Sequence, residues 1–464
     1  MFLSRIALDA FRAFGRGLCA LLVSGALVVA GIGSASAQNL PTVRDAEIEA
    51  LVRDYAKPLL AAAGLGRKNI EIVLVNDPGF NAFVSGRRIF MNTGTLMTAE
   101  TPNEVIGVLA HEIGHLAGGH QERLRLQVDR AKTLAMVGML LGMGTLAAGA
   151  ATKSSELGGV GMGMATGSGE AARRSLLAYQ RSEETAADRS ALTYLEATHQ
   201  SARGMLKTFK RFQSALALSG TRIDPYQISH PTPRDRIANL EVLARKSPYF
   251  ETRDDPELQR RHDRMRAKIA AFTNGRGSTA QLFRQNNDVE AKQYGEAIEG
   301  YLHGNPRAAL AKVDALIKAD PNNPYHYELR GDTLMKANKP AEAADAYGRA
   351  IKLDPARSSV LQVSYGQALL AQGSPKTAKK AAQAFQRAIA ADPENTTAYR
   401  YLAQAYGQLG QVGQAELAAA DGHYYSGNFQ DAKIFAARAQ KKLKPGSPEW
   451  LRAQDIINYR KPRG

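Results

Sequence analysis

The feature that most constrains the fold of this chain is a regular repetition in its C-terminal third. Asp320-Pro321 and Asp354-Pro355 stand 34 residues apart, and Asp392-Pro393 follows 38 residues later. Small and aromatic residues recur between these dipeptides at matching offsets: Gly331, Ala343, Tyr347 and Ala350, then Gly366, Ala382, Phe385 and Ala388. Self-similarity at a fixed period of this size indicates a stack of repeated helical units.

The period and the offsets are those of a tetratricopeptide unit, in which two helices pack against each other. The small residues let the paired helices approach closely, and each proline ends the second helix of a pair. A third unit shows Ala403, Tyr406 and Ala415. Weaker half-units lie at residues 308–316 and 429–439, and a short insertion lies at residues 374–380. The alternative, a generic alanine-rich bundle, would leave the 34-residue register accidental.

Length and charge limit the number of domains and the kinds of partner that the chain can have. A chain of 464 residues exceeds one ordinary core and predicts two or three domains. The formal net charge of +16 suggests acidic partners such as nucleic acid, anionic lipid or lipopolysaccharide, or simply a well-solvated surface. No arginine cluster alternates with aromatic residues as single-strand binders require, so we expect no nucleic-acid partner.

The N-terminus predicts export. Three arginines precede an apolar run at residues 18–32, and Ala35-Ser36-Ala37 offers the small-x-small pattern that signal peptidase reads. We expect residues 1–37 to be a cleaved signal peptide, with an uncleaved membrane anchor as the alternative. The one cysteine, Cys19, lies inside this segment. The mature chain would therefore have no thiol, which excludes disulfides and a cysteine peptidase and fits a bacterial periplasmic protein.

The N-terminal half mixes helical and extended patterns. Apolar residues at helical spacing predict a helix over residues 42–64, and three short runs at residues 70–75, 81–84 and 88–92 read as extended. Thr101-Pro102 opens a helix that we expect to run to about Arg130. The fold class is therefore α+β and mainly helical: a first domain with a small sheet, followed by an α-solenoid of tetratricopeptide-like repeats.

His111-Glu112-Ile113-Gly114-His115 is the motif that carries chemistry. Histidines four residues apart lie on one face of a helix, so both imidazoles can reach one tetrahedral ion. Glu112 lies one step round the helix, where it can take a proton from the attacking water and pass it to the leaving amine. Such a pattern is typical of a zinc peptidase, although buried helical histidines also occur as structural groups.

The third ligand must come from elsewhere in the chain. His120 lies about half a turn away from His111 on a continuous helix, so we expect it to miss the ion. Glu184 and Asp188 share one face of a later helix that begins near Leu176, and Glu183 points away from that face. One of the two carboxylates can bind the metal while the other orients an imidazole from outside the ligand sphere. The alternative for Glu184 is a solvated carboxylate in a charged run.

Between the two halves of this site lies an apolar segment. Residues 133–152 are long enough to cross a bilayer, and residues 158–169 are a flexible, Gly- and Met-rich stretch. A single crossing would separate the metal-site residues, so a helical hairpin, a mobile flap or a surface-inserted segment is favoured over a single crossing, and ordinary buried core is the alternative. Membrane-surface contact by residues 133–152 is therefore expected. Its Gly and Met content also suits a surface that repacks around varied apolar partners.

Two further segments complete the site. His230 precedes Pro231 in a rigid turn, with Arg236 following. It could stabilise the oxyanion of the tetrahedral intermediate or occupy the fourth zinc position and hold the enzyme latent. The extended residues 81–84 could accept a substrate backbone by strand addition.

Together these motifs resemble metallopeptidase family 48, the HtpX-like gluzincins, and within it the periplasmic BepA-like group with tetratricopeptide tails. The resemblance rests on the residues already described: Asn81-Ala82-Phe83, the motif at residues 111–115 with His120, Glu184-x-x-Ala187-Asp188, and Ser229-His230-Pro231 with Arg236-Ile237. It implies one Zn²⁺ per chain.

The family resemblance also implies a role for each site residue. His111, His115 and Glu184 would bind the zinc, with Glu112 as general base and His230 as a further catalytic residue near the metal. Asp188 and, beyond it, Arg236 would support the ligands from outside.

The function expected is a zinc endopeptidase of the periplasm that hydrolyses misfolded or stalled outer-membrane proteins. Its repeats would bind the substrate or the outer-membrane assembly machinery. The alternative is an envelope chaperone or adaptor with a largely latent zinc site. The expected boundaries are residues 1–37 for the signal peptide, 38–272 for the peptidase domain, 273–288 for a linker and 289–460 for the repeats. The charged residues 257–268 also read as part of the linker region.

Overall fold

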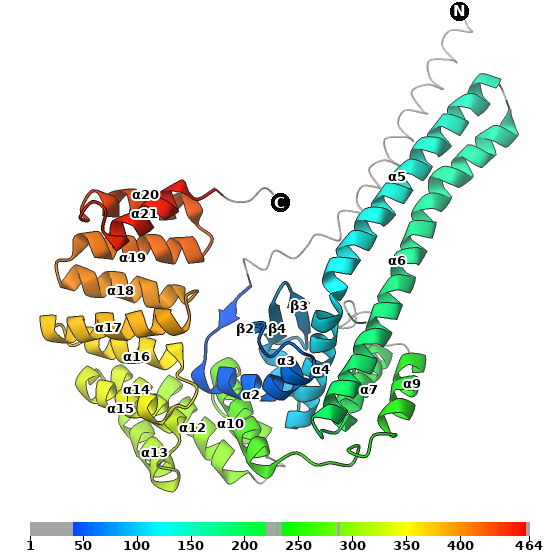
Figure 1. The fold of residues 1–464 in the computed structure, drawn as a ribbon. Coiled ribbons are helices and arrows are strands. Elements are labelled where there is room, and N and C mark those ends of the chain that lie inside the picture. The colour runs from blue at the N-terminus through cyan, green and yellow to red at the C-terminus, as the bar shows by residue number, and fades with distance from the viewer. Residues whose placement is uncertain (1–39, 153, 220–229, 231–233, 285–287, 461–464) are drawn as a thin grey trace, which may run out of the picture. The chain divides into compact units, whose positions relative to one another are not determined.

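The computed structural model describes residues 40–152, 154–219, 230, 234–284 and 288–460. The expected signal peptide and the residues next to His230 in the chain lie outside this part. The described residues confirm the expected fold class, with helices dominating and one small sheet before a series of helix pairs (Figure 1).

The sheet has four strands in the order β1-β2-β4-β3: β1 Thr42–Val43, β2 Glu71–Val75, β3 Ala82–Ser85 and β4 Arg88–Asn92. Strands β2 and β4 run parallel, while β3 pairs antiparallel with β4 and β1 with β2. The three extended runs are thus confirmed. The helix expected from residue 42 begins later, because Asp45 is extended and its side chain accepts from the backbone N–H of Ile48.

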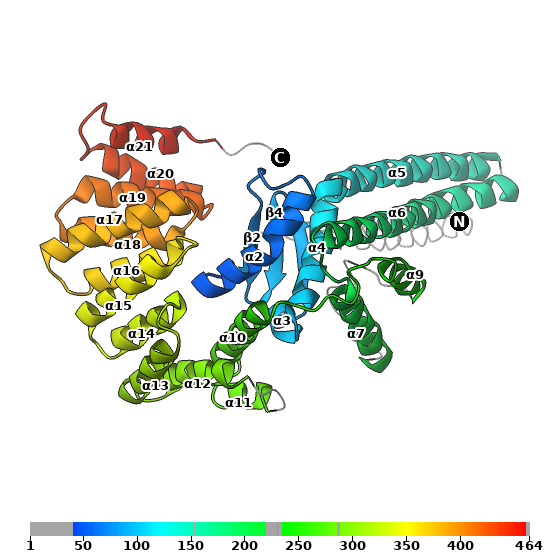
Figure 2. The ribbon, with the colours of Figure 1, turned by 60° about the horizontal axis from the view of Figure 1, so that its bottom comes forward.

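Helices cover the sheet: α2 Ala46–Ala62, α3 Thr93–Thr98 and α4 Pro102–Gly118. Figure 2 shows α2 in front of the strands with α4 beside it. Tyr55, Leu59 and Leu109 are fully buried in the core between these elements. Helix α4 ends at Gly118 because Gly119 adopts the left-handed conformation at φ 64°. The expected continuation to Arg130 was wrong.

A long hairpin follows, formed by α5 His120–Thr152 and α6 Ser155–Ala197. Figures 1 and 2 both show its two arms side by side. Helix α6 begins about twenty residues before the expected start near Leu176, so residues 158–169 are helical and not a flexible stretch. The hairpin itself was among the expected alternatives, but its large apolar side chains are exposed, which contradicts ordinary buried core.

Between the hairpin and the repeats, the described residues form the helices α7 Arg203–Ser219, α9 Arg234–Ala244, α10 Pro256–Thr273 and α11 Ser278–Leu282. The charged stretch at residues 257–268 was expected in a linker region, but it lies in α10, an ordered and largely buried helix. Its apolar residues Met265 and Ile269 enter the core of the first domain. Its buried charges are paired: Arg264 contacts Glu47, and Lys268 contacts Asp45.

The repeats form five consecutive helix pairs: α12 Val289–His303 and α13 Pro306–Ala319, α14 Pro324–Lys336 and α15 Pro340–Leu353, α16 Ser359–Leu370 and α17 Pro375–Ala391, α18 Thr396–Gln408 and α19 Val412–Tyr425, α20 Phe429–Gln440 and α21 Pro448–Asn458. Gly331 must be small, because a Cβ there would lie 2.5 Å from the ring of Tyr347. Gly366 stands in the same relation to Phe385. The expected insertion lengthens α17 at its N-terminus.

Candidate metal centre

Helix α4 positions the first half of the site. Its residues from Pro102 to Gly114 are buried, so His111 and Glu112 lie in the interior and not on a solvated face. Gly114, inside the motif, allows α6 to approach closely, because a Cβ there would lie 2.8 Å from the carbonyl oxygen of Ala187. This close crossing of α4 and α6 brings the carboxylate of Glu184 to the two histidines.

Four side chains converge on one point: His111, His115, Glu184 and His230. Nε2 of His111 lies 3.1 Å from Nε2 of His115 and 3.3 Å from Nδ1 of His230. A carboxylate oxygen of Glu184 lies 3.3 Å from Nε2 of His115 and 3.0 Å from Nδ1 of His230. The three candidate ligands expected from the sequence are thus brought together, and His230 joins them.

The spacing of these atoms fits a tetrahedral ion. Zinc–nitrogen bonds of roughly 2.0–2.1 Å place neighbouring tetrahedral ligands about 3.3 Å apart, which is close to the separations found here. Imidazole nitrogens with a carboxylate oxygen are a donor set that zinc accepts readily. The two facing Nε2 atoms of His111 and His115 would oppose their lone pairs unless a proton or a cation lay between them. The residues present therefore fit a zinc ion.

Asp188 supports the site from outside. Its Oδ1 lies 3.0 Å from Nδ1 of His111, which places the imidazole proton on Nδ1 and leaves Nε2 for the metal. Arg236 donates two hydrogen bonds to Asp188, at 2.6 and 2.8 Å, and its Nη1 lies 2.9 Å from Glu184. The guanidinium also lies over the ring of Phe209. The structure thus brings the two expected outer residues, Asp188 and Arg236, together beside the candidate ligands.

A second outer chain was missed from the sequence. Nδ1 of His120 lies 2.9 Å from Nδ1 of His115, and Nε2 of His120 lies 3.2 Å from Glu183. Arg123 also donates to Glu183 at 2.7 Å. His120 misses the metal position, as expected, yet it contacts a ligand, because α4 ends at Gly118 and the chain turns back. The Gly118-Gly119 pair was the signal that could have indicated this turn.

Glu112 is fully buried, and neither of its carboxylate oxygens accepts a hydrogen bond from the residues that the structure describes. One oxygen lies 3.5 Å from Nε2 of His230. Burial raises the pKa of Glu112, although His230 and His111 oppose this shift. An unsatisfied buried carboxylate beside a set of metal ligands is suited to receive a proton.

The other ionisable groups of the site respond to burial and to one another. Burial would lower the pKa of His111, but Asp188 and Glu184 outweigh it and raise that pKa to about 9. Burial lowers the pKa of His115 to about 3. Burial would raise the pKa of Glu184, but His230, His111 and His115 hold it well below the ordinary value. The pocket is therefore built around negative charge that a cation balances.

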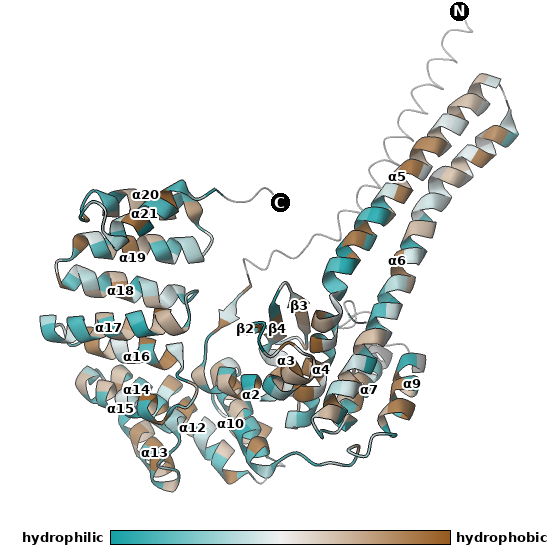
Figure 3. Cartoon of the chain, in the orientation of Figure 1, coloured by the Kyte–Doolittle hydropathy of each residue, from teal (hydrophilic) through white to brown (hydrophobic). Residues whose placement is uncertain are grey.

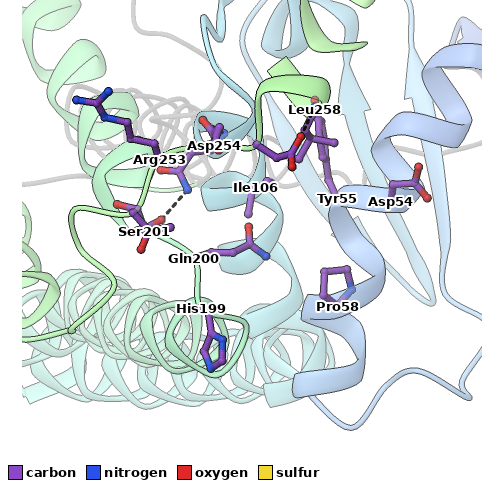
Figure 4. Close-up of a pocket in the computed structure, with 13 residues that line it drawn as sticks. Asp54, Tyr55, Pro58, Ile106, His199, Gln200, Ser201, Arg253, Asp254 and Leu258 are labelled. Atoms are coloured by element: carbon purple, nitrogen blue, oxygen red, sulfur yellow. Dashed lines mark hydrogen bonds between the residues drawn. The ribbon is translucent and has the colours of Figure 1, made fainter. Parts of the chain in front are cut away.

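A separate surface cavity of about 220 Å³ lies near the start of α4 (Figure 4). Tyr55, Ile106, Ser201 and Asp254 are among its lining residues. Asn103 ties its wall together by donating to the carbonyl oxygen of Ser201 at 2.7 Å. None of the four converging side chains lines this cavity, so it is not the candidate metal centre.

Two segments of the chain match models of known families. Residues 42–244 match the model of peptidase family M48. Residues 314–419 match the model of the cytochrome c-type biogenesis protein H TPR domain. The resemblance to this metallopeptidase family and to tetratricopeptide repeats is thereby confirmed.

Relatives match this chain over most of its length. The beta-barrel assembly-enhancing protease of Escherichia coli (strain K12) is 23% identical over 421 residues, covering 89% of this chain and 83% of the relative. The protein of the same name from Yersinia pestis is 23% identical over 427 residues, with the same coverage. Among solved structures, MamA is 23% identical with a TM-score of 0.28, covering 35% of this chain and 90% of its own.

Proposed function

We propose that this chain, whose residues 42–244 are a peptidase family M48 domain followed by tetratricopeptide-like repeats, is a zinc metalloendopeptidase of the bacterial periplasm. The observation that carries the proposal is the convergence of His111, His115 and Glu184 at tetrahedral spacing, with the buried Glu112 beside them. A scaffold would have no need of an unsatisfied carboxylate at that position.

The proposed mechanism assigns one task to each side chain. His111, His115 and Glu184 hold the ion, and Asp188 keeps the Nε2 lone pair of His111 directed at it. When bound, zinc would supply a Lewis acid that polarises the scissile carbonyl and acidifies a water. Glu112 takes the proton of the attacking water and delivers it to the leaving amine. Its raised pKa matches this double use, because a carboxylate of ordinary acidity would retain the proton poorly.

His230 is proposed to close the resting site. Its Nδ1 lies among the ligand atoms, where a fourth ligand would leave no position for water or substrate. The side chain is also buried, with 8% of its surface exposed. In this proposal His230 must withdraw before a peptide can bind.

The substrate is proposed to bind as an added strand. β3 is an edge strand of the sheet, its other side being paired with β4. It also contacts α4, the helix that carries the motif. An extended peptide paired with β3 would gain main-chain hydrogen bonds while passing the metal centre.

The substrates are proposed from the relatives. Proteins named beta-barrel assembly-enhancing protease match 89% of this chain. We therefore assign misfolded or stalled outer-membrane proteins as substrates, with the repeats contacting them or the assembly machinery. The proposed boundaries are residues 38–272 for the peptidase domain, 273–288 for the linker and 289–460 for the repeats.

One observation favours a second candidate function. The ligand atoms are buried and His230 lies among them, an arrangement that also suits a chaperone or adaptor with a latent zinc site. The repeats would then carry the cellular role.

Degradation of casein or of an unfolded outer-membrane protein distinguishes the two candidates. The purified mature chain is compared with Glu112→Gln and His230→Ala, with the zinc content determined for each. We expect Glu112→Gln to keep its zinc and to cleave at least about 100-fold more slowly. We expect His230→Ala to cleave faster than the parent. Loss of activity in His230→Ala would reassign that residue as a transition-state donor. Zinc binding without cleavage by any of the three would favour the chaperone.

A further inference from the structure

The outer part of the α5–α6 hairpin exposes its large apolar side chains. Met136, Leu140 and Leu141 on α5 are 62%, 59% and 56% exposed, and Val160 on α6 is 55% exposed. Among the described residues, α5 is the one helix long and apolar enough to cross a membrane, and only 11% of its most apolar window is buried. Figure 3 shows the brown, hydrophobic residues along both arms. In water, a monomeric protein rarely exposes an apolar surface of this length.

The contact between the arms is made by small residues. Apart from His120 at its base, the buried residues of α5 are Gly142 and Gly149. A Cβ at Gly161 would lie 2.6 Å from the backbone nitrogen of Leu146, and one at Gly138 would overlap Ser168. This arrangement is the reverse of a water-soluble helix pair, in which large apolar residues lie inside. It is the packing of helices in lipid, where small residues let backbones approach and large ones face the acyl chains.

Charged residues mark one end of the apolar region. Gly138 lies against Ser168, so the residues just before Thr133 and just after Gly169 lie at the same level of the hairpin. Four basic and two acidic side chains gather there: Arg130, Lys132, Arg173 and Arg174, with Asp129 and Glu170. A net positive ring of exposed side chains complements anionic lipid headgroups.

The length of the apolar part of α5 matches a bilayer. Residues 133–152 form 20 helical residues, which at a rise of about 1.5 Å each span roughly 30 Å, the thickness of the hydrocarbon core. The polar residues Ser154, Ser155 and Glu156 lie at the far end, where the opposite headgroups would be. Because α6 returns, the two halves of the metal centre stay on one side.

We propose that the α5–α6 hairpin is inserted in a lipid bilayer and crosses it twice. An unfolded protein client would need a groove of large apolar residues, whereas the large apolar side chains of α5 face outward and glycines join the two arms. Glu184 lies ten residues beyond Arg174 on the same helix, so the metal centre would stand about 15 Å from the headgroups. If the peptidase proposal also holds, its substrates are polypeptides at a membrane surface.

The test uses the mature chain with Glu112→Gln, so its outcome does not depend on peptidase activity. Because Cys19 lies in the expected signal peptide, Leu140→Cys supplies a unique thiol for an environment-sensitive dye. Ile434→Cys on α20, 49% exposed, is the matched control. With vesicles of phosphatidylethanolamine and phosphatidylglycerol, we expect the emission of a dye at residue 140 to shift to the blue. Nitroxide-labelled lipid tails should quench that emission several-fold, and they should not quench a dye at residue 434. Unchanged emission at residue 140 would overturn the proposal.

Flotation with the same vesicles gives the second measurement. Leu140→Asp/Leu141→Asp should lower the vesicle-bound fraction by roughly 100-fold, because each carboxylate is costly in hydrocarbon, while Ile434→Asp should float like the parent. Zinc content equal to that of the parent shows that the double variant is folded. A double variant that floats undiminished would contradict insertion. Insertion would also be contradicted if the dye at residue 140 responded to unfolded outer-membrane protein in the absence of lipid but did not respond to vesicles.

Discussion

Asp188 is the residue through which the fold controls the metal centre without touching the ion. It lies 3.0 Å from Nδ1 of His111 and receives both hydrogen bonds of a bidentate arginine, Arg236. We expect Asp188→Asn to weaken zinc affinity by about 10- to 100-fold, since the imidazole loses its anionic partner. Competition with a chelating dye measures this. Glu196→Gln, an exposed position on the same helix, is the control, and equal weakening in both variants would contradict the assignment.

His262 couples stability to pH. Tyr55 donates to its Nδ1 at 3.0 Å, and its Nε2–H donates to the carbonyl oxygen of Ala99 at 2.9 Å, so the neutral ring is fully satisfied. Burial lowers its pKa to about 3. The unfolded chain, with a pKa of about 6.5, binds the proton first as pH falls. The stabilisation is therefore complete above about pH 6.5 and is lost as the pH falls toward 3.

Urea denaturation at pH 7 and pH 5 measures this contribution. His262 alone should remove about 2 kcal/mol of stability between the two pH values. His262→Gln should unfold at lower urea than the parent at pH 7, but its stability should fall less on acidification. Parallel pH dependence in the two proteins would show that His262 does not titrate in this way.

At the scale of elements, glycines decide how closely paired helices pack. Gly331 and Gly366 each face an aromatic ring, at 2.5 Å from where a Cβ would be. Gly331→Ala or Gly366→Ala should lower stability by about 1–3 kcal/mol through overpacking. Gly348, in α15, has its nearest neighbour at 3.8 Å, so Gly348→Ala should be neutral or raise stability by up to about 1 kcal/mol. Thermal unfolding of the three variants tests this, and equal destabilisation by all three would refute it.

Elements also show where sequence reasoning succeeds. The zinc motif and the pair Glu184 and Asp188 were predictable, because helical spacing alone places such side chains on one face. The contact between His120 and His115 was not, since it depends on where α4 ends. The early start of α6 was missed because glycine disfavours an isolated helix, whereas here it lets two arms pack closely.

At the scale of the whole molecule, a buried ionic cluster links the peptidase domain to the repeats. Lys268 of α10 lies 2.8 Å from Asp45, 3.5 Å from Glu47 and 3.4 Å from Glu328 of α14. Tyr294 of α12 donates to Glu47 at 2.7 Å. The charged residues of α10 were predicted from the sequence to belong to a linker. That prediction was wrong because composition alone does not reveal that buried charges have partners on distant elements.

Removal of that lysine should destabilise the molecule strongly. Lys268→Met leaves buried carboxylates without their cation and should cost about 3–5 kcal/mol. Lys312→Met removes an exposed lysine whose side chain is 53% accessible, and should change stability by less than about 1 kcal/mol. Denaturant unfolding followed by circular dichroism compares the two. Lys268→Met as stable as Lys312→Met would show that the cluster does not hold these helices together.

The central claim is that His111, His115 and Glu184 hold one zinc ion in this fold. Bound zinc, measured by elemental analysis of the mature chain after dialysis, tests it most directly when adjacent glutamates are compared. The account predicts one zinc per chain in the parent and in Glu183→Gln, and much less than one in Glu184→Gln. The reason is that the carboxylate of Glu184 lies 3.3 Å from Nε2 of both His111 and His115. Equal zinc in Glu184→Gln and the parent, or none in the parent, would contradict it.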